Sequence, residues 1–351
     1  MHLTLVVPEL IWPEPDEQDT FADLACPGLC TLLARSRRQQ LPAQSVEATL
    51  AEFFGLAVQP PYAALRLAGE NAAPAAAAGA WLCADPVHLR LHQERLLLAE
   101  GDGLELALDE AQALLDELNR HFAEVGRFHP ACAERWYLQL AADHQPGGGD
   151  ALPLSAVAGR RVARQLPETP DLRWLRRLLN EAQMVLHRHP VNEAREAAGR
   201  PTINSLWLWG AGMLPPRLGS EFTGVWSDDA LARGLALCAQ AAVHAPPVDA
   251  ASLLRALEQH GRHLLVLDAL QRPVHYQDAE AYRSRLRELD RDWFAPLQQA
   301  LAGGRLATIE LCAPTAYGLL TWRSGRAEQW RLWRRPCALQ ATALALAKGA
   351  E

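Results

Sequence analysis

Residues 187–212 read HRHPVNEAREAAGRPTINSLWLWGAG, and this stretch predicts more structure than any other in the chain. It predicts, in order, a helix end, a polar turn, a buried strand and a glycine-rich turn. Asn192 and Arg195 are three residues apart, so a single helical turn presents both on one face. We expect these two side chains to line a pocket.

The residue types of this block suit a small anion. The guanidinium of Arg195 is a planar fork that fits carboxylate or phosphate, and the amide of Asn192 both donates and accepts. Gly210 and Gly212 follow the strand, and ligands of open α/β sheets bind at the carboxyl ends of strands. Alternating tryptophans and a glycine turn are equally typical of an ordinary core, so the residues alone leave both interpretations open.

Short apolar runs alternate with longer helical patterns along the rest of the chain. Near-continuous apolar runs are typical of strands buried on both faces of a largely parallel sheet. They predict strands at residues 3–7, 80–83, 205–209, 263–268 and 306–311. Helical spacing predicts helices at residues 45–56, 172–186, 229–243 and 279–301. The fold class predicted is an α/β sandwich of three layers with a mostly parallel sheet.

One segment interrupts this alternation. Residues 81–149 combine strand-like runs with a long helical pattern and are predicted to form a small inserted α+β subdomain. Stretches rich in alanine, proline and glycine flank the segment at 71–80 and 145–149 and are typical of linkers. The core is then discontinuous and comprises residues 1–80 and 150–351.

Composition limits the classes of partner. The chain has 351 residues, 49% of them hydrophobic, and a net charge of −7, so we expect a globular protein that binds neither nucleic acid nor an anionic membrane. Two arginine clusters lie near carboxylates in the sequence and are interpreted as solvated faces; they are Arg35, Arg37, Arg38 and Arg331, Arg334, Arg335.

The first residues, the lengths of the apolar runs and the cysteines together predict a cytoplasmic protein. The first apolar run stops at Pro8 without a preceding basic stretch, unlike a signal peptide, and no run reaches the roughly 18 apolar residues of a membrane span. Seven scattered cysteines suit reduced thiols. Cys26 and Cys30 are one helical turn apart, but a zinc site needs two further ligands and the sequence offers no second pair.

The pattern HPxNxxRxxxGxxxxNxxWxWGxG, residues 189–212, resembles the matching stretch of the archaeal-type cofactor-independent phosphoglycerate mutases. These enzymes belong to the alkaline phosphatase-like superfamily of metal-dependent phosphate enzymes. The order of the surrounding strands, helices and insert is also similar over nearly the whole chain. The resemblance implies an alkaline phosphatase-like sandwich and adds Asn204 to the side chains expected at the pocket.

The resemblance also implies a serine nucleophile and a metal-binding aspartate at the end of the first strand. Ser45, before a predicted helix, stands at the place of the nucleophile, although the residue type and position equally suit a helix N-cap. The first strand runs into Pro8-Glu9, and Glu9 is one position later and one methylene longer than the implied aspartate.

The remaining metal ligands implied by the resemblance are largely missing. Asp268 and His275 follow a predicted strand with altered spacing, and the final Asp-His pair is replaced by LCAPT at residues 311–315. Two metal ions need several ligands each. We therefore expect no resident cofactor, with manganese or zinc present only in an active enzyme.

Three functions remain open. The first is a mutase-like protein without metal-dependent activity that binds a small phosphorylated or carboxylated ligand. The second is an active mutase or phosphatase that transfers phosphate through Ser45 with a rebuilt metal site. The third is a scaffold that binds a protein partner.

Overall fold

The computed structural model describes residues 1–14, 16–21, 23–56, 59–72, 79–92, 95–99, 101–144, 152–157, 173–257, 261–331, 333–336 and 338–348. The contacts within the chain divide it into two compact units. Unit 1 comprises Met1–Thr49, Gly219–Ala232 and Gln240–Glu351, and unit 2 comprises Leu50–Leu218 and Arg233–Ala239.

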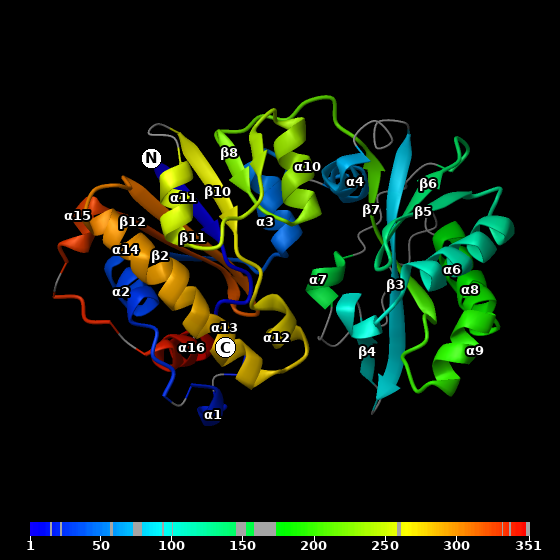
Figure 1. The fold of residues 1–351 in the computed structure, drawn as a ribbon, viewed down its shortest axis with the longest axis horizontal. Helices are drawn as coiled ribbons and strands as arrows, with labels where there is room; N and C mark the ends of the chain where they lie inside the picture. The colour runs from blue at the N-terminus through cyan, green and yellow to red at the C-terminus, as the bar shows by residue number, and fades with distance from the viewer. Residues whose placement is uncertain are drawn as a thin grey trace. The chain divides into compact units, whose positions relative to one another are not determined.

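Unit 1 is built on a mixed sheet of seven strands in the order β2-β12-β11-β1-β10-β8-β9 (Figure 1). The strands are β1 (His2–Val6), β2 (Arg37–Leu41), β8 (Gly224–Trp226), β9 (Ala242–His244), β10 (Arg262–Val266), β11 (Thr308–Thr315) and β12 (Gly318–Gly325). β1 pairs in parallel with both β10 and β11, and β12 and β2 extend the sheet as antiparallel strands. The predicted α/β class with a mostly parallel sheet is therefore confirmed.

The helices of unit 1 are α1 (Gln18–Phe21), α2 (Pro27–Arg35), α11 (Ala250–Ala256), α12 (Gln271–His275), α13 (Ala279–Leu289), α14 (Ala295–Ala302), α15 (Arg326–Gln329) and α16 (Leu339–Lys348). A π-helical turn, η4 (Asp290–Phe294), joins α13 to α14. Figure 1 shows these three as one long rod in front of the sheet. Buried leucines of the rod, including Leu286 and Leu297, pack with Leu5 and Leu265 in one core.

Asp290 supplies the cap that α2 lacks. No side chain of its own N-cap residue bonds to the first turn of α2. The carboxylate of Asp290 instead accepts from the N–H groups of Gly28 (3.3 Å) and Leu29 (2.6 Å). Gly28 permits this approach, because a Cβ there would lie 2.5 Å from the Cα of Ala295. The contact satisfies backbone donors that a helix leaves free at its start.

Unit 2 contains an antiparallel sheet with the path β4-β3-β6-β5, and β7 pairs with the other side of β3. Its strands are β3 (Ala80–His92), β4 (Arg95–Ala99), β5 (Gly126–Cys132), β6 (Arg135–Leu140) and β7 (Ser205–Met213). The predicted strands 80–83 and 205–209 exist, but their assignment to the parallel sheet is wrong. They pair antiparallel with each other, because an apolar run indicates a buried strand without identifying its partner.

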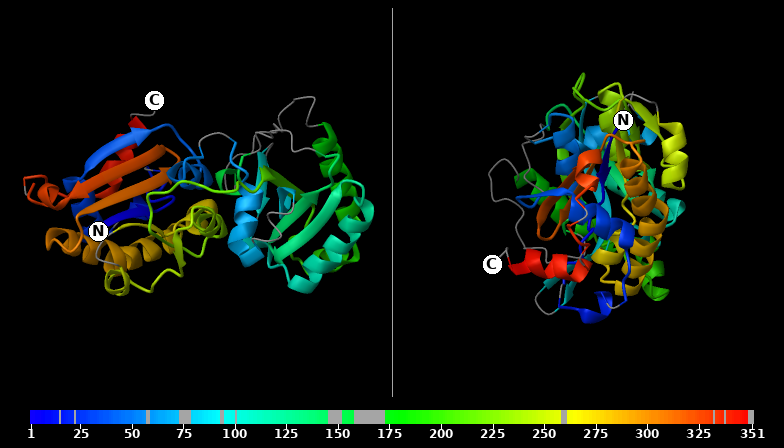
Figure 2. Two further views of the ribbon diagram at one scale, coloured as in Figure 1. Left: turned by 90° about the horizontal axis from the view of Figure 1, so that it is seen from above. Right: turned by 90° about the vertical axis from the view of Figure 1, so that its left-hand side faces the viewer.

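Helices cover both faces of this sheet (Figures 1 and 2). Leu82 and Ala84 of β3 face a core formed with α6 (Leu108–His121) and α8 (Arg173–His187), while Trp81 and Cys83 face α4 (Tyr62–Leu67). The remaining elements are η1 (Ala68–Ala72), η2 (Gly101–Leu104), α7 (Leu154–Val157) and α9 (Pro190–Ala197). The two-residue alternation of β3 thus separates the two cores of unit 2.

Two helices, α3 (Val46–Phe53) and α10 (Ala230–Cys238), begin in unit 1 and end in unit 2. The predicted helix 229–243 is too long, since the chain turns at Gln240 with a φ of +58° and enters β9. Unit 2 includes the whole predicted insert 81–149 together with residues 50–80 and 150–218. The predicted linker residues 73–78 and 145–149, and Leu172 of the predicted helix 172–186, lie outside the described residues. None of the helices in the described ranges combines the length and the apolar character needed to cross a membrane.

Candidate functional site

The block 187–212 lies in unit 2, where it forms the end of α8, all of α9 and most of β7. Asn192 is 3% exposed. Its amide donates to the carbonyl oxygens of Leu186 (2.8 Å) and Ile203 (2.7 Å) and accepts from the N–H of Ile203 (2.8 Å). Asn192 therefore ties the end of α8 to the segment that enters β7.

Arg195 is fully buried, and protein groups bind its guanidinium. Its Nε donates to the Pro201 carbonyl (2.8 Å), and its Nη1 donates to Glu110 Oε2 (2.6 Å) and to the Glu105 carbonyl (3.3 Å). Its Nη2 donates to the carbonyl of Leu104. The guanidinium of Arg195, which would suit an anionic ligand, is thus already paired with the carboxylate of Glu110 in the same unit.

Asn204 uses both ends of its amide on β3. Its Oδ1 accepts from the N–H of Leu89 (2.7 Å), and its Nδ2 donates to the carbonyl of the same residue (2.8 Å). Its own N–H donates to the Val87 carbonyl (3.2 Å). The side chain therefore continues the β3–β7 ladder one residue beyond the strand.

Gly210 and Gly212 lie within β7, so the turn predicted for them is wrong. Their φ values are +67° and +154°, which side-chain-bearing residues rarely adopt. A Cβ on Gly210 would lie 2.7 Å from the Cβ of Tyr62, and one on Gly212 would lie 2.5 Å from the Cβ of Pro61. These glycines therefore allow β7 to pack closely against Pro61 and Tyr62, and the close contact is with protein atoms. Ligand binding by the five predicted residues of the block remains a prediction.

The first residues of the block border open space. Two adjoining cavities of about 600 Å³ and 470 Å³ lie along α6 and α8 and share His121 and Glu181. The side chains Arg188 and His189 line the larger one, and His144, Trp174 and Arg177 line the smaller one. We refer to the two cavities together as the α6–α8 groove.

Charges of both signs line the α6–α8 groove. Arg177 Nε donates to Glu181 Oε1 (2.6 Å), and His121 Nε2 lies 3.3 Å from Glu181 Oε2. The hydrogen bond from Arg177, and that from His121 after it, lower the pKa of Glu181. Arg188 is exposed and lines the groove without an ion pair to any carboxylate in the described part of the chain. It is therefore the groove cation best placed to meet a ligand.

A buried cluster on the α4 face of the sheet has no counterpart in the sequence prediction. Arg66 of α4 forms two hydrogen bonds to the carboxylate of Asp85, at 2.9 and 2.6 Å. Asp85 also accepts from the indole of Trp209 (2.8 Å), and Arg66 donates to the hydroxyl of Tyr137 (2.8 Å). The guanidinium lies over both rings, 4.7 Å from the Tyr137 centroid and 5.1 Å from that of Trp209.

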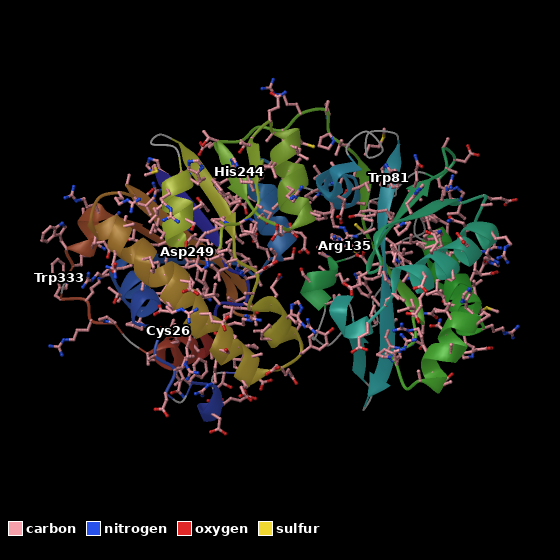
Figure 3. All side chains as sticks on the ribbon, in the orientation of Figure 1. Cys26, Trp81, Arg135, His244, Asp249 and Trp333 are labelled. Carbon is pink, nitrogen blue, oxygen red and sulfur yellow. The ribbon has the colours of Figure 1, made fainter. Side chains whose placement is uncertain are left out.

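The same cluster continues to Glu70 and Arg135. Tyr137 donates to Glu70 (3.2 Å), and Arg135, labelled in Figure 3, binds the two oxygens of Glu70 at 2.5 and 3.1 Å. These residues come from α4, η1, β3, β6 and β7, at no regular spacing in sequence, so no periodic signal was available. Trp209 was the one member inside the block. The charges and rings bind one another, which is the arrangement of a buried structural network.

Ser45 caps α3. Its Oγ accepts from the N–H of Ala48 (3.1 Å), three residues on, and its carbonyl accepts from the N–H (3.0 Å) and the hydroxyl (2.9 Å) of Thr49. The N-cap interpretation is confirmed. A role as nucleophile remains a prediction.

The other residues implied by the resemblance lie on separate elements of unit 1. Glu9 follows β1, is 5% exposed, has a φ of +55° and donates through its N–H to the Pro314 carbonyl (2.9 Å). Asp268 follows β10, and desolvation of its carboxyl, then the negative charge of Asp228, raise its pKa. His275 ends α12.

These donors do not fit a two-metal centre. Within the described ranges, no group of three or more histidine, cysteine, aspartate or glutamate side chains is placed to hold a metal ion. Cys312 and Ala313 of β11 stand in the segment where the resemblance implies an Asp-His pair, and they are 2% and 0% exposed. Burial raises the pKa of the Cys26 thiol to about 12, so that thiol is protonated at neutral pH and is a poor metal ligand.

No family model matches the chain. A segment of 145 residues is 30% identical to the 2,3-bisphosphoglycerate-independent phosphoglycerate mutase of Methanosarcina mazei, over 40% of this chain and 36% of that protein. A segment of 98 residues is 35% identical to the probable enzyme of the same name from Geobacter sulfurreducens, over 26% of this chain and 24% of that protein. The matched segments thus span well under half the length of these relatives.

The structure is similar to that of the PH0037 protein from Pyrococcus horikoshii, with a TM-score of 0.54 and 13% identity over 92% of this chain and 87% of that one. At this identity the likeness shows a shared fold, while the sequence matches show shared descent. The chain is a distant homologue of the archaeal-type cofactor-independent phosphoglycerate mutases.

Proposed function

We propose that this protein is a phosphoglycerate mutase relative that binds a small anion and does not carry out metal-dependent phosphoryl transfer. The residues at the end of β11 support this proposal. Where the resemblance implies two metal ligands, Cys312 and Ala313 are buried between the neighbouring strands β1 and β12. Glu9, Asp268 and His275 cannot supply the several ligands that each of two ions needs.

The strand ends of unit 1 are also a poor place for an anion without metal. Asp268 and Asp228 follow neighbouring strands and carry interacting carboxylates. Their negative charges would repel phosphate or carboxylate. A small anion is better accommodated in unit 2, in the α6–α8 groove, because its carboxylates Glu117 and Glu181 are paired with Arg120 and Arg177 while Arg188 lines the same open space. The names of the relatives favour a phosphoglycerate as the ligand.

Mutase assays separate this proposal from the active-enzyme alternative. We expect no conversion of 3-phosphoglycerate to 2-phosphoglycerate above the blank with Mn²⁺ or Zn²⁺, for the wild type and for Ser45→Ala alike, and no stoichiometric metal by elemental analysis. Activity that requires Ser45 would establish the alternative and refute the proposal.

Calorimetry with 3-phosphoglycerate tests the binding site. Arg188→Gln removes a charged donor and should weaken binding about tenfold or more. Arg127→Gln is the matched control, because Arg127 is an exposed arginine of unit 2 on β5, outside the groove lining. Absence of binding by the wild type, or equal binding by the two variants, would refute the groove as the site.

A further inference from the structure

The two arginine clusters of the sequence lie next to each other in unit 1, at the edge of the sheet. β2, which carries Arg37 and Arg38, pairs with β12 just before the segment that carries Arg334 and Arg335. Arg334 Nη1 donates to the Ser36 carbonyl at 3.2 Å, so segments almost 300 residues apart in sequence are in contact. The sequence interpretation as two separate solvated faces is therefore incomplete.

This surface is cationic on an acidic protein. Residues 323–348 include six arginines or lysines and one carboxylate, that of Glu328, in a chain whose net charge is −7. Arg37 also lies directly opposite Arg323 in the β2–β12 register, and both are exposed. Like charges directly opposite in an antiparallel pair are destabilising. Glu328 Oε1 lies 3.2 Å from Arg37 Nη2 and offsets part of this repulsion.

Two exposed indoles lie in the chain segment that leads to Arg334. Trp330 is 69% exposed and Trp333 is 76% exposed, whereas the nine other tryptophans are buried or half-buried. Figure 3 shows Trp333 projecting from unit 1 into solvent. Exposed tryptophan beside arginine is the composition of energetic hot spots in protein interfaces. We name the set formed by Arg37, Arg38, Trp330, Trp333, Arg334 and Arg335 the Arg–Trp patch.

The patch borders an open sheet edge. β2 is the terminal strand of the seven, and all five of its residues are exposed. In the described part of the chain, no strand pairs with its outer side, so alternate N–H and C=O groups are available to an added strand. Arginine on an edge strand commonly serves to block such pairing, but that role does not require exposed tryptophans next to it.

We propose that an acidic, extended segment of a partner protein adds to the sheet at β2. Its backbone pairs with the free edge, its carboxylates meet the arginines of the Arg–Trp patch, and its apolar side chains contact Trp330 and Trp333. A short bound segment interacts electrostatically with this patch alone, because the charges on the rest of the protein are screened beyond about 8 Å at physiological ionic strength. A nucleic acid or a membrane extends over the acidic remainder of the chain and is disfavoured.

Fluorescence anisotropy with a labelled eight-residue peptide of alternating glutamate and valine tests this proposal. We expect saturable binding that weakens with salt, and none for the matched peptide with lysine in place of glutamate. Trp330→Ala combined with Trp333→Ala, and Arg37→Glu combined with Arg38→Glu, should each weaken binding about tenfold or more. Binding should also slow hydrogen exchange of the β2 amides.

Two controls keep the result specific. Val248→Ala removes another exposed apolar side chain of unit 1 (87% exposed), and Arg127→Glu reverses an exposed charge of unit 2; neither should change binding. The proposal fails if the glutamate peptide does not bind, if it binds the patch variants equally, or if single-stranded oligonucleotide or phosphatidylserine vesicles bind the patch more tightly than the peptide does. All variants should stay folded with thermal midpoints close to that of the wild type, because the substituted side chains are exposed and the partly exposed Arg37–Glu328 ion pair contributes at most about 1 kcal/mol.

Discussion

At the residue scale, Arg195 has a structural environment that its position in the motif did not indicate. It donates to Glu110 and to three backbone carbonyls while fully buried. Arg195→Met leaves those acceptors without a donor and the Glu110 carboxylate with one partner fewer. We expect the free energy of unfolding to fall by about 3–5 kcal/mol, measured by urea denaturation.

Arg200 provides the matched control, because it binds the other oxygen of the same carboxylate at 2.9 Å with a side chain that is 37% exposed. Arg200→Gln should cost less than about 1 kcal/mol. An Arg195→Met protein with wild-type stability that had lost anion binding would instead assign Arg195 to a ligand.

The spacing of Asn192 and Arg195 correctly predicted that the two residues share one helix, α9, in which both are buried. Sequence could not indicate whether the partner was a ligand or the backbone, because carbonyl oxygens and anions satisfy the same donors. The Arg66–Asp85–Trp209 cluster was missed for a related reason. Its members are 19 and 124 residues apart, and only the folded sheet brings them together.

At the scale of elements, α11 begins at a carboxylate cap whose contribution depends on pH. Asp249 Oδ1 accepts from the N–H of Ser252 at 2.7 Å, and the hydrogen bonds from the side chain and backbone of Ser252 lower the pKa of Asp249. A lowered folded-state pKa adds stability above the unfolded value, about 4, and this is lost as pH falls through the folded value. Wild type should therefore be more stable than Asp249→Asn at pH 7, with the gap closing toward pH 3.

Asparagine is the informative replacement because it keeps the capping oxygen and removes only the charge. Thermal midpoints of both proteins between pH 7 and pH 3 supply the comparison. A gap that stays constant, or widens on acidification, would contradict the assignment of the charge to the cap.

The sequence predicted best those strands whose side chains are buried on both faces of the sheet. The central strands β10 and β11 were anticipated because both of their faces are apolar. β2 was missed because its sequence RRQQL is polar and wholly exposed at an edge, and β8 and β9 are too short, at three residues each, to show a period. β7 was found and placed in the wrong sheet, since pairing depends on long-range contacts that periodicity does not encode.

At the scale of the molecule, the two units have separate hydrophobic cores. Leu265 and Leu138 are each 0% exposed, the first in the core of unit 1 and the second in that of unit 2. Leu265→Ala and Leu138→Ala should each cost about 2–5 kcal/mol. Hydrogen exchange followed by mass spectrometry should show faster opening of the strands in the substituted unit, with those of the other unit unchanged.

Leu265→Ala and Leu138→Ala serve as controls for each other, because both replace a leucine that is 0% exposed with alanine. Equal loss of protection in both units from either substitution would show that they unfold as a single cooperative body.

The pairing of β1 has a consequence for synthesis on the ribosome. β1 begins at His2, its partner β10 begins 260 residues later, at Arg262, and β11 follows at Thr308. At about 5–20 residues per second, the nascent chain waits roughly 13–50 s before β1 can pair. The long segment Leu50–Leu218 of unit 2 is translated within that interval. The apolar side chains of Leu3, Leu5 and Val6 therefore stay without the strands that flank them in the folded sheet until β10 and β11 have been synthesised.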